Sequence, residues 1–184
     1  MPTDSGMCIG MFIGDPSLKL IAQPQISGPT PSATMSSPTK IATTPGAALA
    51  ADAFAQASDF FAIGSNDLTM YTLAIDRGNE HVAHLFDPLH PGVLRLIQFT
   101  ATAALRARIP VSICGEMAGD PRYSALLLGL GIRDLSMTPS SIPRVKQRIR
   151  EMDMDAANRR AGVIMDQVDS GRIATLLDDF NALA

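Results

Sequence analysis

The sequence has little of several things that mark particular classes of protein. Its 184 residues include no tryptophan, two cysteines and no apolar run near the roughly 18 residues needed to span a bilayer. The two cysteines, Cys8 and Cys114, are too few for a disulfide-stabilised secreted domain, so a reducing compartment is expected. Lys and Arg number 15 against 18 Asp and Glu, which argues against the broad positive surface of a nucleic-acid or anionic-membrane binder. We expect a cytoplasmic globular protein that binds neither nucleic acid nor membrane.

Charge is scarcest at the start of the chain, where the composition also differs. Residues 1–44 contain only four charged side chains, Asp4, Asp15, Lys19 and Lys40, and prolines recur there among Ser, Thr and Gly from residue 22 onward. Proline removes a backbone donor and disfavours helix in the residue before it, while small polar residues offer little apolar area against the entropy of ordering. We therefore expect a disordered coil over 1–44, with an extended segment lying on a neighbouring surface as the alternative.

From residue 45 onward, short apolar runs alternate with helical patterns. The expected strands are 59–64, 110–114 and 134–137, and the expected helices are 47–57, 90–108, 122–130, one from Pro143 and two pieces after residue 155. The apolar face expected for helix 90–108 consists of Val93, Leu94, Ile97, Ala101, Ala104 and Leu105. This alternation predicts an α/β fold with about three βα units in residues 45–152, followed by a helical tail in 153–184. In such folds the chemistry lies beyond the carboxyl ends of the strands.

Two polar residues and an arginine follow the first expected strand. Asn66 and Asp67 come directly after it, and oxygen ligands of this kind suit Mg²⁺ and a substrate anion. Arg77, in the run Asp-Arg-Gly-Asn, has a planar guanidinium that can hold a phosphate or carboxylate through two hydrogen bonds. The alternative is structural: Asn66 and Asp67 would cap the next helix, and Arg77 would pair with Asp76 or Glu80 at the surface.

A cysteine ends the second expected strand, in the run ICGEMAGDP. Cys114 is followed by Gly115 and Glu116, so its thiol is expected among flexible backbone and an acid. A thiol with its ordinary pKa of about 8.5 is protonated at neutral pH and can give a proton to carbon. The alternative is a buried cysteine that acts as a small hydrophobic side chain.

Long runs in residues 45–152 resemble one enzyme family. FFAIGSNDLTMYTLAIDRGN, HLFDPLHPGVLRLI, ICGEMAGDP and LLLGLGIRDLSMTPSSIPRVK are similar to the C-terminal barrel of phosphoenolpyruvate-protein phosphotransferase, enzyme I of the sugar phosphotransferase system. The resemblance implies part of a phosphoenolpyruvate-utilising (β/α)8 TIM barrel. It implies phosphoryl transfer from phosphoenolpyruvate to a protein histidine and on to a phosphocarrier protein, with Mg²⁺ as cofactor and a homo-oligomeric assembly.

The same resemblance implies roles for four residues. Asn66 and Asp67 would contact phosphoenolpyruvate, Asp67 would also bind Mg²⁺, Arg77 would hold the substrate and Cys114 would protonate the enolate. Glu116 is expected to orient a neighbour by a hydrogen bond, or else to form a structural ion pair. These roles fit the chemistry, because loss of the phosphoryl group leaves an enolate that needs a proton.

The sequence also departs from the family pattern. Thr43 stands where the family has a metal-binding glutamate, and a domain carrying the phosphorylated histidine has no counterpart. We expect His81, His84 and His90 to be surface or capping residues. We interpret residues 1–44 as foreign to the family and the barrel as truncated. The alternatives are a non-catalytic interaction module or degraded remnant, and a fragment of pyruvate phosphate dikinase or phosphoenolpyruvate synthase.

Overall fold

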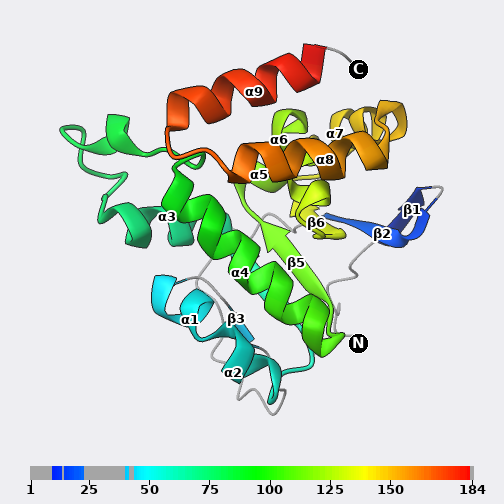
Figure 1. Ribbon diagram of the computed structural model, residues 1–184, viewed down its shortest axis with the longest axis horizontal. Coiled ribbons are helices and arrows are strands. Elements are labelled where there is room, and N and C mark those ends of the chain that lie inside the picture. Colours follow the sequence, from blue (N-terminus) through cyan, green and yellow to red (C-terminus); the bar gives the residue numbers. More distant parts are fainter. Residues whose placement is uncertain (1–9, 14, 23–39, 42–43, 183–184) are drawn as a thin grey trace, which may run out of the picture.

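The computed structural model describes residues 10–13, 15–22, 40–41 and 44–182 (Figure 1). Within this part of the chain the strands form one six-stranded sheet in the order β1-β2-β6-β5-β4-β3. The strands are β1 (Gly10–Ile13), β2 (Asp15–Ala22), β3 (Lys40–Ile41), β4 (Phe61–Gly64), β5 (Val111–Cys114) and β6 (Asp134–Met137). Each neighbouring pair from β2 to β3 is parallel, and β1 is antiparallel to β2. The three strands predicted after residue 45 are confirmed as β4, β5 and β6.

The expectation of coil throughout residues 1–44 is wrong for their described part. There the backbone forms β1, β2 and β3. The central strands β6 and β4 would each leave an edge of unpaired N–H and C=O groups, which another extended segment can satisfy. Residues 19–22 of β2 pair with residues 134–137 of β6, and residues 40–41 of β3 pair with residues 61–62 of β4. Residues 1–9, 14, 23–39 and 42–43, including Cys8 and Thr43, lie outside the described residues.

Helices connect the strands and cover the sheet. In chain order they are α1 (Pro45–Leu49), α2 (Ala51–Ala55), α3 (Ser65–Leu73), the 3₁₀ helix η1 (Ala83–Leu85), α4 (Pro91–Ala107), α5 (Glu116–Gly119), α6 (Pro121–Gly129), α7 (Ile142–Glu151), α8 (Met154–Met165) and α9 (Ser170–Ala182). Figure 1 shows α4 lying along the sheet, and α4 contacts both β4 and β5. The predicted helices are confirmed, although the first is divided at Ala50 into α1 and α2.

Several helices begin where a polar side chain precedes a proline. His90 accepts a hydrogen bond from the N–H of Gly92 and is followed by Pro91, which starts α4. Asp120 accepts one from the N–H of Arg122 at the start of α6. A side chain in this position satisfies a backbone donor that has no partner within the helix. Proline in the first turn costs no hydrogen bond, because an N–H group at that position would have no acceptor within the helix.

The core lies between the sheet and its helices. Alternate residues are buried in β4 (Phe61 and Ile63) and in β5 (Val111 and Ile113). In β6 the three consecutive residues 135–137 are buried. The intervening residues of β4 and β5, which include Gly64 and Cys114, are only partly buried because they point to the other face of the sheet. None of the helices in the described residues is long and apolar enough to cross a membrane.

One core prediction on α4 is wrong. Val93, Leu94, Ile97, Ala101 and Ala104 are all fully buried, as the apolar pattern predicted. Leu105 is instead 55% exposed. Around the helix axis it lies within about 20° of the buried Leu94, but it stands in the last turn of α4, which ends at Ala107.

Candidate active site

The carboxyl ends of β4, β5 and β6 lie side by side. Gly64 is directly opposite Cys114, and Cys114 is opposite Ser136. The residues that follow these strands therefore emerge at the same edge of the sheet, where parallel α/β folds place their binding sites. This register brings together the segments that begin at Ser65, Gly115 and Thr138.

Asn66 and Glu116 connect the first two of these segments. The N–H of Glu116 donates to Oδ1 of Asn66 at 3.5 Å, across 50 residues of sequence. Asn66 is partly buried and Glu116 is exposed. The capping alternative for Asn66 and Asp67 does not hold, because α3 begins after Gly64 with no side-chain cap. Both residues lie within the first turn of the helix instead.

Arg77 is held at the same edge by two contacts. Its Nη2 donates to Oε1 of Glu116 at 2.8 Å. Its guanidinium also lies over the ring of Phe86, 4.5 Å from the ring centre, in a cation–π contact. The expected alternative partner Asp76 instead accepts from the N–H of Gly78. Arg77 is thus fixed in direction while 39% of its side chain stays exposed.

Cys114, which is half-buried, is the last of the predicted residues at this edge of the sheet. Its carbonyl oxygen accepts a hydrogen bond of 2.8 Å from the hydroxyl of Ser65. No disulfide to Cys114 exists among the described residues. The structure therefore gathers Asn66, Glu116, Arg77 and Cys114 at one edge, although 48 positions separate Asn66 from Cys114 in the sequence.

Asp67 lies exposed in the first turn of α3. Within the described part of the chain it forms no hydrogen bond or ion pair, and no cluster of three or more His, Cys, Asp or Glu side chains is present. Mg²⁺ in phosphoryl-transfer sites is commonly held by one or two carboxylates together with substrate phosphate oxygens and water. The exposed Asp67 carboxylate, next to the Asn66 carboxamide, fits the arrangement in which one carboxylate holds the ion together with phosphate oxygens and water.

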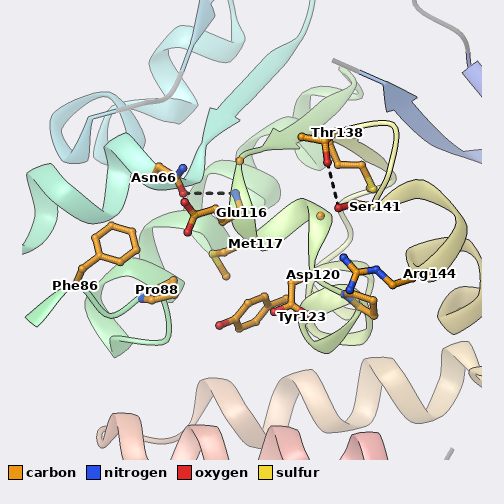
Figure 2. A pocket seen from close by; sticks show the side chains of 14 residues that line it. Asn66, Phe86, Pro88, Glu116, Met117, Asp120, Tyr123, Thr138, Ser141 and Arg144 are labelled. Atoms are coloured by element: carbon orange, nitrogen blue, oxygen red, sulfur yellow. Dashed lines mark hydrogen bonds between the residues drawn. The ribbon is translucent and has the colours of Figure 1, made fainter. Parts of the chain in front are cut away.

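A pocket of about 540 Å³ opens next to these residues (Figure 2). Figure 2 shows Asn66 and Glu116 at one end and Thr138, Ser141 and Arg144 at the other. The complete lining is Asn66, Phe86, Pro88, Gly115, Glu116, Met117, Gly119, Asp120, Pro121, Tyr123, Met137, Thr138, Ser141 and Arg144. Cys114, Asp67 and Arg77 do not line it, so the pocket adjoins the group of predicted residues and does not enclose it.

Several lining residues were not predicted from the sequence. Phe86 comes from the segment after η1, and Tyr123 and Arg144 come from the first turns of α6 and α7. Desolvation by burial raises the pKa of the Tyr123 hydroxyl above its ordinary value, so this hydroxyl is neutral across the physiological range. Thr138 and Ser141 follow β6, and the one sequence signal that pointed to them is the general rule that such sites lie beyond the carboxyl ends of the strands.

The three histidines take the roles expected of them. His90 caps α4 through Nδ1, and His81 and His84 are both exposed. None of the three lines the pocket.

Comparison with known proteins decides the family. The sequence model described as "PEP-utilising enzyme, PEP-binding domain" matches residues 37–154, which is more than half of the chain. The chain belongs to this family. The fold described above, a mostly parallel sheet with connecting helices, agrees with the barrel-type architecture that the resemblance implied.

Curated relatives carry related names. The phosphoenolpyruvate-protein phosphotransferase of Cupriavidus necator is 52% identical over 124 residues, covering 67% of this chain and 20% of that protein. The enzyme of the same name from Haemophilus influenzae is 43% identical over 137 residues, covering 74% of this chain and 24% of its own length. A multiphosphoryl transfer protein of Xanthomonas campestris is 50% identical over 117 residues, covering 64% of this chain and 14% of that protein. The chain thus matches less than a quarter of the length of each.

Proposed function

We propose that this member of the PEP-binding domain family takes part in phosphoryl transfer from phosphoenolpyruvate to a protein histidine. The proposal is supported most directly by the convergence at the sheet edge of the residues that the family resemblance singles out. Asn66, Arg77 and Cys114 come from separate elements, and two hydrogen bonds at Glu116 join Asn66 and Arg77. The names of the relatives support the same reaction class.

In this proposal Asn66 and Arg77 bind and orient phosphoenolpyruvate. The carboxamide of Asn66 can hydrogen-bond the substrate, and the guanidinium of Arg77 can grip a phosphate or carboxylate group through two N–H donors. The contacts of Arg77 with Glu116 and Phe86 keep the guanidinium at this edge before the substrate arrives. Less ordering entropy is then lost on binding.

Asp67 would hold Mg²⁺ together with the phosphate oxygens of the substrate. A bound cation neutralises charge on the group being transferred. Asp67 suits this role because its carboxylate is exposed and is not engaged by a neighbouring cation among the described residues.

Cys114 would protonate the enolate of pyruvate that remains after phosphoryl transfer. The bond between phosphorus and the enol oxygen breaks, the phosphoryl group passes to an acceptor nitrogen, and the enolate of pyruvate remains. Transfer of the Cys114 thiol proton to the methylene carbon completes pyruvate and leaves a thiolate. The phosphoryl-accepting histidine and the phosphocarrier protein after it would be supplied by other polypeptide segments, because His90 caps a helix and neither His81 nor His84 lines the pocket.

A second candidate is a module that binds the same substrate without turnover. The observation that favours it is that the described residues contain no group of three or more His, Cys, Asp and Glu side chains that could hold a metal ion. The two candidates differ in one step, the movement of a proton at carbon.

Exchange of the pyruvate methyl protons tests that step without any phosphoryl acceptor. The acid that protonates the enolate is also the base that removes a proton from pyruvate in the reverse direction, so an active site exchanges these protons with D₂O. We expect the purified chain with Mg²⁺ to accelerate loss of the pyruvate methyl signal in proton NMR. Cys114→Ser should reduce the protein-dependent rate by about 100-fold or more, because one general acid–base group contributes that much.

Cys8→Ser is the matched control and should leave the exchange rate unchanged. Equal rates for the wild-type chain and Cys114→Ser would remove Cys114 from the mechanism. A wild-type rate no higher than that of buffer with Mg²⁺ would favour the second candidate.

A further inference from the structure

We infer that Ser65 is a positioning residue, whose hydroxyl fixes the end of β5 and thereby the direction of the Cys114 side chain. The inference rests on the proposed function for its catalytic meaning, but the contact itself is independent of it. Neither the sequence motifs nor the names of the relatives assign a role to Ser65. The geometry of three neighbouring residues carries the argument.

The hydroxyl of Ser65 joins two strand ends. Ser65 is the first residue of α3, directly after β4, and only 1% of it is exposed. Its Oγ donates to the carbonyl oxygen of Cys114 at 2.8 Å, between residues 49 positions apart. The two strands already pair at this level, since Gly64 is opposite Cys114. The Ser65 hydroxyl therefore adds one hydrogen bond between the two segments just beyond the last paired residues of β4 and β5. Without it, the segments that follow these strands would have no such link at this position.

Ser65 is itself held in place from the helix side. The hydroxyl of Thr69, which is fully buried, donates to the carbonyl oxygen of Ser65 at 2.8 Å. A buried polar side chain that lacks such partners is costly, so two buried hydroxyls in one helical turn call for an explanation. Here one of them fixes Ser65, and the other fixes Cys114.

Gly115 shows how closely the two segments approach. Its φ is +107°, a conformation that side-chain-bearing residues rarely adopt. A Cβ at this position would lie 2.5 Å from Oγ of Ser65 and 3.3 Å from Oδ1 of Asn66. The backbone of β5 can pass this close to α3 only because residue 115 has no side chain.

These contacts couple the proposed proton donor to the proposed substrate-binding residues. Ser65 holds Cys114, and Asn66, the next residue of α3, accepts from the N–H of Glu116 two positions beyond Cys114. Glu116 in turn holds Arg77. Substitution of Ser65 should therefore affect the position of the Cys114 thiol more than that of Asn66 or Arg77, because the Ser65 hydroxyl bonds the backbone of Cys114 itself.

Alkylation of Cys114 by iodoacetamide at one fixed pH measures the position of the thiol directly. The modified peptide is quantified by mass spectrometry, which separates Cys114 from Cys8. Ser65→Ala removes the tether, so the half-buried thiol should become more accessible and its alkylation rate should rise about threefold or more, the range that one net hydrogen bond allows.

Thr100→Val is the matched control. It removes another buried hydroxyl bond, of 2.9 Å to the carbonyl oxygen of Leu96 within α4, and this bond does not involve Ser65. Both variants should lower the urea midpoint of unfolding to a similar extent, but only Ser65→Ala should accelerate alkylation. Equal acceleration in the two variants would mean that Ser65 acts through general stability alone, and the inference would be wrong.

A double substitution tests the interlock with Gly115. Gly115→Ala should also accelerate alkylation, because its new Cβ displaces Oγ of Ser65. In the variant carrying both Ser65→Ala and Gly115→Ala, the rate increase should be less than the product of the two single increases, since the closest clash is gone. A fully multiplicative increase would contradict the interlock.

The outcome separates the positioning contact from the proposed function. Alkylation needs neither phosphoenolpyruvate nor pyruvate. Faster alkylation of Ser65→Ala, together with unchanged pyruvate exchange in Cys114→Ser, would confirm the positioning contact and overturn the proton-donor role.

Discussion

Two arginines of this chain pair with carboxylates in different ways. Arg77 meets Glu116 through a single bond of 2.8 Å. Arg122, in contrast, binds both oxygens of Asp178 on α9, with Nε to Oδ1 at 2.7 Å and Nη2 to Oδ2 at 2.9 Å. A two-bond pair of planar groups fixes geometry strongly, whereas a one-bond pair leaves donors available. Arg77 therefore keeps N–H groups for a ligand, and Arg122 serves to attach α9 to α6.

The Arg122–Asp178 pair predicts a pH dependence of stability. The hydrogen bond from Arg122 lowers the pKa of the Asp178 carboxyl below its ordinary value of 3.8. A carboxyl whose pKa is lowered by folding stabilises the native state above its unfolded pKa, and this contribution is lost as the pH falls through the folded value. Asp178→Asn should therefore be less stable than wild type at pH 7, and the two should converge as the pH falls below about 3.8.

Urea unfolding at a series of pH values measures this difference. Asp52→Asn provides the control, because the exposed Arg106–Asp52 pair is longer, at 3.6 Å, and should matter less. A stability difference for Asp178→Asn that stays constant from pH 7 to pH 2 would contradict the account.

At the scale of elements, the close packing of α6 against α8 depends on one glycine. A Cβ on Gly129 would lie 2.6 Å from the carbonyl oxygen of Ala157 and 2.6 Å from Cβ of Ala161. Ala157 and Ala161 are themselves buried, so small residues on both helices allow the backbones to approach. This contact helps to place the C-terminal helices over α6, whose first turn contributes Tyr123 to the pocket.

Gly129→Ala should therefore push the two helices apart. We expect a loss of about 1 to 3 kcal/mol in the free energy of unfolding, the usual cost of overpacking against a backbone that cannot yield. Gly162→Ala, on α8, is the matched control because nothing lies within 4 Å of its Cβ position. It should be neutral or stabilising by up to about 1 kcal/mol, since alanine is the better helix former. Urea unfolding of the two variants decides the point, and a neutral Gly129→Ala would contradict this packing.

The elements also show what the sequence could predict. Strand β5 was recognisable because four apolar or small residues end at Gly115, and β6 because a short run with Leu135 and Met137 ends before Pro139. Helix α4 was recognisable because its apolar residues recur at helical spacing. The bounds of α3 were not, because two of its buried positions hold the polar residues Ser65 and Thr69. Those two residues contact the end of β5 and the helix backbone, so polar side chains replace the expected apolar stripe.

The candidate site was predictable to the same limited extent. That Asn66 and Cys114 share an edge follows from the parallel order of the strands before them. The pairing of Arg77 with Glu116 and its stacking on Phe86 do not follow, because they depend on the path of the chain between α3 and α4 and on side-chain directions. The strands β1, β2 and β3 were missed because the proline-rich composition that begins after residue 22 was taken as typical of all of residues 1–44. The open edges of β6 and β4 could still pair with extended segments in this region.

At the scale of the whole molecule, the sheet places the family's predicted residues at one edge, next to a pocket of about 540 Å³. Five of its strands run parallel, so the ends of β4, β5 and β6 point the same way. The match to the family covers residues 37–154, and α9 packs beyond it. The central claim is that this edge of the sheet binds phosphoenolpyruvate.

Phosphorus-31 NMR of phosphoenolpyruvate with Mg²⁺ and the purified chain tests that claim most directly. We expect the phosphate signal to shift or broaden with added wild-type protein at millimolar substrate, and Arg77→Ala to weaken the apparent affinity by about tenfold or more, the value of one charge-assisted contact. Arg106→Ala is the matched control, an exposed arginine whose ion pair with Asp52 lies away from the pocket lining. The predicted result is an unchanged affinity in Arg106→Ala and an affinity weakened by about tenfold or more in Arg77→Ala. Equal binding by all three proteins would contradict the account.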